Sequence, residues 1–433
     1  QNIKIMFAIV ILVGGKGSRV SAISNGKSKQ EIEIFPNKKL IDYQINQLKS
    51  LNKKFFFVSN TKYHSLKTYL NKKYKKKINF EIIEEKKPLG TAGALKFLEK
   101  FRYKFYLLVD GDLIFNINVK KLIEYHIKKK SDCTLIVHPN NHPYDSDCLD
   151  VNSENRVIRL FSKPHHKKKI IKNLCMSGIK IINKEKIRII KKNCFQDFSK
   201  FFLPKLIINK SRIFAYNTRE YIKDAGTLDR IKQVRKDIKS IKYKLGNINN
   251  KIPAIFLDRD GVLNKQINKN IYQNPKKLFK NVENAVSKIN RSGYLAILIT
   301  NQPAVAKGFI SVKKLENDLD YLNYQMGLKG AYLDRMYYCP HHPEKGFKGE
   351  NIDLKIKCNC RKPNNGMFLK AISDLNIDYK KSFMIGDNYT DFFAAKKSRI
   401  NFILVNQKNN PLKLLSKKSV IEAVNYIFKK TNV

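Results

Sequence analysis

Short apolar runs, each followed by a turn rich in glycine or acidic residues, recur along the chain and predict buried β-strands. The clearest runs are residues 7–13, 105–109, 253–257, 294–299 and 382–385. In the second half they alternate with stretches of helical apolar spacing, at residues 282–291, 313–326, 366–375 and 391–397. Strands that alternate with helices are typical of a doubly wound sheet. We therefore expect an α/β protein.

The strand at 253–257 runs directly into Asp258-Arg-Asp260-Gly261. Because side chains alternate along a strand, Asp258 and Asp260 leave its carboxyl end on the same side, and Gly261 allows a sharp turn. This end of a strand is where open α/β sheets bind ligands. Two carboxylates there could divide phosphoryl transfer between a nucleophile and a proton carrier, with Mg²⁺ offsetting their repulsion. A solvated acidic turn is the simpler reading of this motif taken alone.

Further polar side chains follow the next two strands of the second half. They are Thr300, Asn301, Asp387 and Asp391, and the segment Arg361-Lys362-Pro363 adds a lysine. The carboxyl ends of parallel strands share one edge, so we expect these groups to meet there. Asp258 would then attack phosphorus, and Asp260 would protonate the leaving oxygen and later activate water. Thr300 and Lys362 would hold phosphoryl oxygens, while Asp387, with Asp391 near, would complete a Mg²⁺ site with Asp258 and Asp260.

In this order, the motifs resemble the phosphatases of the haloacid dehalogenase superfamily over residues 253–405. The resemblance implies an aspartyl-phosphate intermediate and Mg²⁺ dependence. No insertion large enough for a mobile cap domain lies between Thr300 and Lys362.

A cysteine and histidine cluster directly precedes Arg361. Cys339-Pro-His341-His342 is followed by Cys358-Asn-Cys360. Three thiolates and one imidazole complete a tetrahedral zinc site without an open position, which is the structural pattern. Spacing leaves His341 and His342 both open as the fourth ligand, and free buried thiols are the alternative.

This loop, with the Asp-Arg-Asp-Gly motif, resembles the heptose bisphosphate phosphatases and their histidinol-phosphate relatives, a family match that favours His341. The resemblance implies that the zinc loop replaces the cap and that Arg361 contacts substrate. The chain departs from the single-domain members at two places, with Pro303-Ala304 where they have Ser-Gly and Lys307 where they have Arg. These positions concern substrate contacts rather than phosphoryl chemistry.

Glycine-rich and acidic turns follow the strands of the first half as well. The turn after residues 7–13 contains Gly14, Gly15, Gly17 and Arg19, and a second turn contains Gly90 and Thr91. Glycines after a buried strand let backbone N–H groups approach phosphates, although any tight turn could use them. Asp112 lies in the acidic turn that follows the strand at 105–109, and Asp224 lies in a later acidic turn.

Residues 6–240 resemble a sugar-phosphate nucleotidyltransferase, an enzyme that joins a sugar 1-phosphate to a nucleoside triphosphate and releases pyrophosphate. The resemblance implies a Rossmann-like domain with a mixed sheet, nucleotide binding by the glycine turns, and Mg²⁺ held by Asp112 and Asp224. It also implies substrate or nucleotide binding by Lys163, which precedes a proline, and a sugar pocket at Ser177-Gly178. The polar run 138–147 resembles the branch that acts on heptose 1-phosphates.

One segment departs from that family. Ser28-Lys29-Gln30 stands where Pro-Lys-Pro is usual, so Lys29 is the residue that could supply the phosphate-binding amine. A domain that has kept the transferase fold and lost its activity is the alternative interpretation.

The length of 433 residues suggests two or three domains. We expect a transferase domain at 1–240, a lysine-rich linker at 241–251 and a phosphatase domain at 252–433. The net charge of +50 comes from 86 basic and 36 acidic residues spread along the chain, which favours anionic small substrates over nucleic acid. No apolar run reaches the length of a membrane span, and seven cysteines do not indicate a disulfide scaffold, so we expect a cytoplasmic protein.

Both halves then indicate one pathway, in which the second domain removes the 7-phosphate of a heptose 1,7-bisphosphate and the first activates position 1. By family, the nucleotide is GTP. The alternatives are a histidinol-phosphate phosphatase or a nucleic-acid end phosphatase, each with a non-catalytic sugar-nucleotide-binding first domain.

Overall fold

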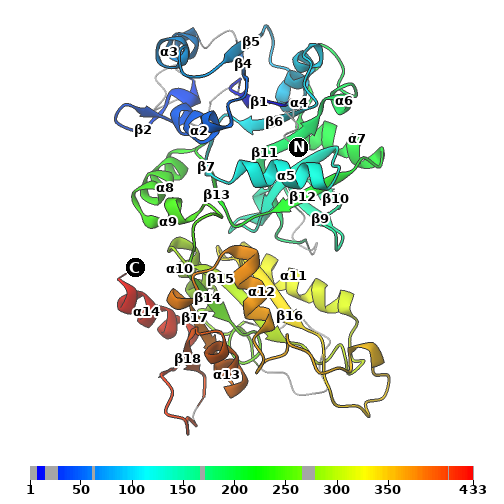
Figure 1. Cartoon of the computed structure of the whole chain (residues 1–433), viewed down its shortest axis with the longest axis vertical. Coiled ribbons are helices and arrows are strands. Elements are labelled where there is room, and N and C mark those ends of the chain that lie inside the picture. The colour runs from blue at the N-terminus through cyan, green and yellow to red at the C-terminus, as the bar shows by residue number, and fades with distance from the viewer. Residues whose placement is uncertain are drawn as a thin grey trace. The chain divides into compact units, whose positions relative to one another are not determined.

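The computed structural model describes residues 7–14, 28–60, 64–165, 171–265, 278–407 and 409–432. The chain forms two compact units (Figure 1). The first comprises residues 1–138, 146–164 and 174–247, and the second comprises residues 139–145, 165–173 and 248–433. The division between Asn247 and Ile248 falls inside the segment 241–251 that we expected as a linker.

The first unit is built on a mixed sheet with the strand order β10-β9-β11-β6-β1-β4-β5, to which β8 and β12 are added beside β11. These strands are β1 (Phe7–Leu12), β4 (Phe55–Asn60), β5 (Phe80–Glu85), β6 (Phe105–Asp110), β8 (Cys133–His138), β9 (Cys148–Val151), β10 (Val157–Phe161), β11 (Cys175–Asn183) and β12 (Ile213–Asn217). Strand β1 pairs in parallel with β4 and β6, whereas β11 runs antiparallel to β6. The expected mixed sheet is confirmed.

Both faces of the central strands of this sheet are buried, which explains why β1 and β6 read as continuous apolar runs. Ala8 and Val10 of β1 belong to one hydrophobic core, and Ile9 and Ile11 belong to another. The covering elements are α2 (Leu40–Leu48), α3 (His64–Tyr74), α4 (Gly90–Gly93), α5 (Val119–Lys128), α6 (Lys184–Ile187) and α7 (Leu203–Ile208). Helices α8 (Leu228–Lys239) and α9 (Ile241–Leu245) pack in a separate hydrophobic core of the same unit. The turn Ala94–Lys100 is a 3-10 helix.

Two small antiparallel pairs complete the first unit. β7 (Leu113–Asn116) pairs with β13 (Tyr221–Asp224), and β2 (Glu33–Phe35) pairs with β3 (Lys38–Lys39). The β7–β13 register sets Asp224 opposite Leu113. A residue late in the unit is thereby brought next to the acidic end of β6.

The second unit contains the expected parallel sheet, with the order β16-β15-β14-β17-β18-β19. Its strands are β14 (Ala254–Leu257), β15 (Leu295–Asn301), β16 (Arg335–Cys339), β17 (Phe383–Gly386), β18 (Asn401–Val405) and β19 (Ser416–Lys417). Its helices are α10 (Val282–Arg291), α11 (Val312–Leu328), α12 (Gly366–Leu375), α13 (Tyr389–Lys397) and α14 (Val420–Thr431). The chain leaves β14 first toward β15 and later toward β17, so β14 ends at the switch point where doubly wound sheets bind ligands. Within the described residues, the helices are too short or too polar to cross a membrane.

Candidate active sites and a metal centre

Asp258 lies at the carboxyl end of β14, and Lys362 reaches it from a loop far along the chain. The Lys362 Nζ lies 2.9 Å from Asp258 Oδ1 and 2.6 Å from Asp391 Oδ1. It also donates a hydrogen bond of 3.0 Å to the carbonyl of Ile299 in β15. All three charged side chains are buried. The lysine therefore joins the ends of two adjacent strands to helix α13, through Asp391.

Negative charge exceeds positive charge in this group. The carboxylate oxygens of Asp258, Asp387 and Asp391 lie within 4.8 Å of one another, around a single ammonium. Burial raises the pKa of Asp258 to about 6, with Lys362 opposing the rise. Burial, together with Asp258 and Asp391, raises the pKa of Asp387 to about 7. Three buried carboxylates against one lysine form a donor set that fits a divalent cation with a preference for oxygen ligands.

Gly261 makes room for this group. Its φ of +83° is in the region that favours glycine, and a Cβ there would lie 1.8 Å from Asp387 Oδ2. The turn after Asp260 can therefore pass close to the Asp387 carboxylate only because residue 261 is glycine.

The carboxylate of Asp260 lies outside the group of three, although we expected it among the Mg²⁺ ligands. Its Oδ2 accepts hydrogen bonds from Arg259 Nε at 3.1 Å and from Gln302 Nε2 at 3.0 Å, and its Oδ1 accepts one from Asn264 Nδ2 at 3.0 Å. Gln302 also donates to Thr300 Oγ1 at 2.8 Å. Sequence reasoning missed Arg259, Gln302 and Asn264 as partners of Asp260, although all three lie within or next to the motifs it used.

Asn301 has a role that the sequence did not indicate. Its Oδ1 accepts a hydrogen bond from the backbone N–H of Lys362 at 3.0 Å, and its Nδ2 donates to the Lys362 carbonyl at 3.0 Å. The amide at the end of β15 therefore holds the backbone of Lys362 in place. Thr300, 1% exposed, stands at the same strand end.

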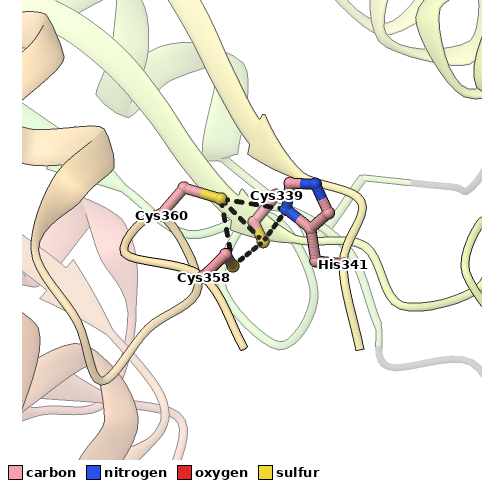
Figure 2. Close-up of side chains that lie close together, drawn as sticks. All are labelled: Cys339, His341, Cys358 and Cys360. Atoms are coloured by element: carbon pink, nitrogen blue, oxygen red, sulfur yellow. Dashed lines mark hydrogen bonds between the residues drawn. The ribbon is translucent and has the colours of Figure 1, made fainter. Parts of the chain in front are cut away.

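The cysteines and one histidine converge in the second unit (Figure 2). The Sγ atom of Cys360 lies 3.1 Å from that of Cys339 and 3.3 Å from that of Cys358, and 3.2 Å from His341 Nδ1. A tetrahedron with Zn–S bonds of about 2.3 Å has sulfur–sulfur edges of about 3.8 Å, so a small expansion would accommodate zinc. The donor set fits a closed structural site.

His341, rather than His342, points its ring at the thiols. The His342 ring instead packs edge-on against Phe347, with 6.0 Å between centroids. Arg361 donates a hydrogen bond of 3.4 Å to the carbonyl of His341, which connects the cluster to the residue before Lys362.

In the first unit, Gly111 carries the acidic turn closely past β1. Its N–H donates to the Leu12 carbonyl at 3.0 Å, and a Cβ at Gly111 would lie 2.4 Å from that oxygen and from Gln30 Nε2. Gly14 follows the same strand β1. Gly15, Gly17 and Arg19 lie outside the described residues.

Asp112, Asp224 and Lys29 gather around Gly226. A Cβ at Gly226 would lie 3.1 Å from Asp224 Oδ1, 3.5 Å from Asp112 Oδ2 and 3.9 Å from Lys29 Nζ. The Lys29 Nζ is 3.6 Å from Asp112 Oδ2, and Asp224 forms an ion pair with Arg230. Burial raises the pKa of Asp112, as do Asp110 and Asp224, while Lys29 opposes the rise. Mutually repelling carboxylates are a donor set suited to Mg²⁺.

Asp110 connects this acidic end to the turn expected to form the sugar pocket. The buried Lys180 Nζ lies 3.1 Å from Asp110 Oδ1. A Cβ at Gly178 would lie 2.5 Å from Asp110 Oδ2, so the Ser177-Gly178 turn contacts this carboxylate.

Other residues expected to bind nucleotide or sugar phosphate make structural contacts. Gly90 has a φ of +78°, and Thr91 Oγ1 accepts a hydrogen bond from Phe198 N at 2.8 Å. The Lys163 N–H donates to Asp147 Oδ1 at 3.1 Å, and the Lys163 side chain is exposed. Their roles in ligand binding stay predictions.

Comparison with known proteins assigns both halves. The family model described as nucleotidyl transferase matches residues 8–241, more than half of the chain, and a HAD-hydrolase-like model matches residues 359–427. The chain belongs to the nucleotidyl transferase family.

Its second half is 35% identical over 160 residues to the D-glycero-beta-D-manno-heptose-1,7-bisphosphate 7-phosphatase of Vibrio cholerae serotype O1, covering 37% of this chain and 84% of that protein. The enzyme of the same name from Pasteurella multocida is 40% identical over 156 residues, covering 35% and 80%. The second half belongs to the family of these phosphatases.

Solved structures also match each half of the chain. HddC from Yersinia pseudotuberculosis is 23% identical with a TM-score of 0.46, covering 54% of this chain and all of that one. The D,D-heptose 1.7-bisphosphate phosphatase from B. bronchiseptica, complexed with magnesium and phosphate, is 22% identical with a TM-score of 0.36, covering 41% and 99%. The family matches confirm the two resemblances noted in the sequence, to a nucleotidyltransferase and to a haloacid-dehalogenase-type phosphatase.

Proposed function

We propose that this chain catalyses two steps of nucleotide-sugar formation. The second domain removes the 7-phosphate of D-glycero-D-manno-heptose 1,7-bisphosphate, and the first transfers GMP from GTP to the resulting heptose 1-phosphate. The observation that carries the proposal is the buried group of Asp258, Lys362, Asp387 and Asp391, in a domain whose relatives are heptose-bisphosphate 7-phosphatases.

In the phosphatase step, a carboxylate oxygen of Asp258 forms a bond to phosphorus as the bond to the sugar oxygen breaks. Asp260 gives its proton to that leaving oxygen. In the second half-reaction Asp260 takes a proton from water, the water oxygen bonds to phosphorus, and the bond to Asp258 breaks. Lys362, 2.9 Å from Asp258, offsets charge on the phosphoryl oxygens.

Two metal ions have a place in this scheme. Asp258 and Asp387, with Asp391 near, would hold Mg²⁺, which neutralises charge on the transferring phosphoryl group when bound. Cys339, His341, Cys358 and Cys360 would hold zinc, which has a structural role because all four ligand positions come from protein.

In the transferase step, an oxygen of the sugar phosphate forms a bond to the α-phosphorus of GTP, and pyrophosphate leaves. Asp112 and Asp224 would hold Mg²⁺ for this displacement, and Lys29 would contact a phosphate oxygen. The 3.6 Å contact between Lys29 and Asp112 supports this assignment.

Incubation of the protein with heptose 1,7-bisphosphate, GTP and Mg²⁺, with product identification, tests the proposal. We expect one inorganic phosphate and one pyrophosphate per GDP-heptose formed. ATP, CTP and UTP test the choice of base, and histidinol phosphate and a 5′-phosphorylated oligonucleotide test the competing substrates. Phosphate release without pyrophosphate from any nucleotide would mean that the first domain only binds, and faster turnover of histidinol phosphate or of the oligonucleotide would refute the heptose assignment.

A further inference from the structure

The segment Ser28–Glu31 brings Lys29 to Asp112 without the prolines expected on both sides of this lysine. Residues 29–31 form a single 3-10 turn, in which the N–H of Glu31 donates to the Ser28 carbonyl at 3.0 Å. Gln30, 3% exposed, lies against Gly111. Contacts made by the turn itself must therefore restrict the backbone torsions that proline rings would otherwise fix.

The carboxylate of Glu31 supplies most of these contacts. Its Oε2 accepts hydrogen bonds from the N–H of Ser28 at 3.3 Å, from Ser28 Oγ at 3.1 Å and from Ser65 Oγ in α3 at 2.7 Å. Its Oε1 lies 3.4 Å from Lys39 Nζ. Glu31 is 5% exposed, so solvent competes little for these bonds.

These bonds act on both sides of Lys29. The bonds to Ser28 close a capping box around the turn, which fixes the backbone on either side of the lysine. The bonds to Ser65 and Lys39 attach the turn to α3 and to β3. The backbone of Lys29 is thus held at a set distance from the turn that contains Asp112. The side chain of the next residue, Gln30, contacts the same turn at Gly111.

We propose that Glu31 is the positioning residue for Lys29 in the transferase, performing by hydrogen bonding the task that flanking prolines perform by ring closure. The inference rests on the proposed function for Lys29, and it extends it, since neither the motif nor the family resemblance indicates Glu31. Glu31 itself does not touch substrate in this scheme.

A double-mutant cycle in the full chain tests the proposal, with pyrophosphate release from heptose 1-phosphate and Mg·GTP as the readout. Glu31→Ala should lower kcat/KM by about 10- to 100-fold, because small misplacements of catalytic groups cost that much. In a Lys29→Ala background the same change should have almost no further effect. Glu31→Gln keeps an acceptor oxygen and should stay within about fivefold of wild type.

Asp132→Ala is the matched control. Asp132 is another buried carboxylate of the first unit, which accepts a hydrogen bond from Arg212 N at 2.8 Å. Asp132 directly precedes β8 and is not part of the Lys29 segment. Any fold-decrease in kcat/KM caused by Asp132→Ala should therefore be the same in the wild type and in the Lys29→Ala background. Urea unfolding of the first unit in each variant checks that the substituted domain is folded.

Crystal structures of the wild type and of Glu31→Ala give a readout that does not depend on turnover. We expect the contact between Lys29 Nζ and Asp112 in the wild type and its loss in Glu31→Ala. The proposal would be overturned if Glu31→Ala lowered kcat/KM by the same factor in the Lys29→Ala background as in the wild type. It would also be overturned if the contact between Lys29 Nζ and Asp112 persisted in the Glu31→Ala structure. A wild type that transfers no nucleotide would refute the proposed function, while the crystallographic comparison would still decide the positioning role.

Discussion

At the scale of single residues, the two chemistries are expected to be separable. Asp258→Asn preserves the shape of the nucleophile but removes its charge, so phosphate release should fall by roughly three or more orders of magnitude. Nucleotide transfer to supplied heptose 1-phosphate should persist. Phosphate and pyrophosphate release measured on the same variant provide the test.

Asp112→Asn is the reciprocal variant. It should abolish most pyrophosphate release and leave phosphate release unchanged, because Asp112 lies in the first unit and Asp258 in the second. Intact phosphatase turnover in Asp258→Asn would show that the Asp-x-Asp-Gly motif has been misassigned.

A single buried histidine should also make the stability of the first unit depend on pH. Burial lowers the pKa of His126 to about 4, although its contact with Asn183 opposes the shift. The ring lies 2.8 Å from Thr134 Oγ1 and 3.0 Å from Asn183 Oδ1. The folded-state pKa is below the unfolded value of about 6.5, so the contribution of neutral His126 to the free energy of unfolding is complete above that pH. This contribution is lost as the pH falls toward 4, by up to about 3 kcal/mol.

His126→Gln is the matched variant, since its amide can donate to Asn183 and accept from Thr134. Urea unfolding of the first unit between pH 7 and pH 4.5 should show a shallower loss of stability in the variant. Parallel curves for the two proteins would contradict the shift.

At the scale of elements, the zinc loop is expected to support the phosphatase site. Cys358 and Cys360 directly precede Arg361 and Lys362, so the cluster sets where the lysine leaves its loop. Structural zinc can contribute on the order of ten kcal/mol to the folding of a small domain. Cys358→Ser should therefore lower phosphatase activity and the melting temperature of the second unit together.

Cys194→Ser is the control for that change, since Cys194 is an exposed cysteine of the first unit. It should leave the zinc content and phosphatase turnover unchanged. Metal analysis that finds no zinc in the wild type, or full activity in a zinc-stripped sample supplied with Mg²⁺, would refute the structural role.

At the scale of the whole molecule, the two reactions should occur in a set order, with the phosphatase first. A phosphate at position 7 adds roughly one and a half to two negative charges. Asp147, the acidic residue of the expected polar run that lies in the first unit, would repel that charge. The transferase should therefore prefer heptose 1-phosphate to the 1,7-bisphosphate.

The Asp258→Asn protein measures this preference directly, because it cannot remove the 7-phosphate. Given the bisphosphate and GTP, it should form little nucleotide sugar, and supplied heptose 1-phosphate should restore formation. Equal rates of pyrophosphate release from the two sugars would end the ordered scheme.

The sequence by itself determined the parts of this protein that depend on short-range pattern. Apolar runs located the central strands to within one or two residues, and helical spacing placed α10 and α12 with their observed bounds. The spacing of the pairs around Cys339 and Cys358 predicted a cluster of thiols with a histidine, and the structure brings these side chains together. Residues 94–100 form a 3-10 helix that follows α4, and apolar spacing alone does not distinguish its hydrogen bonding from that of an α-helix.

Only the tertiary structure decided which side chains share a site. Asp391 joins Asp258 because α13 packs at the end of β17, and Asp260 turns to Gln302 instead of the carboxylate group. The β7–β13 register brings Asp224 to the turn around Gly226 where Asp112 and Lys29 also lie. These contacts join residues separated by tens to hundreds of positions, so strand order and register create them, and no local period in the sequence records either.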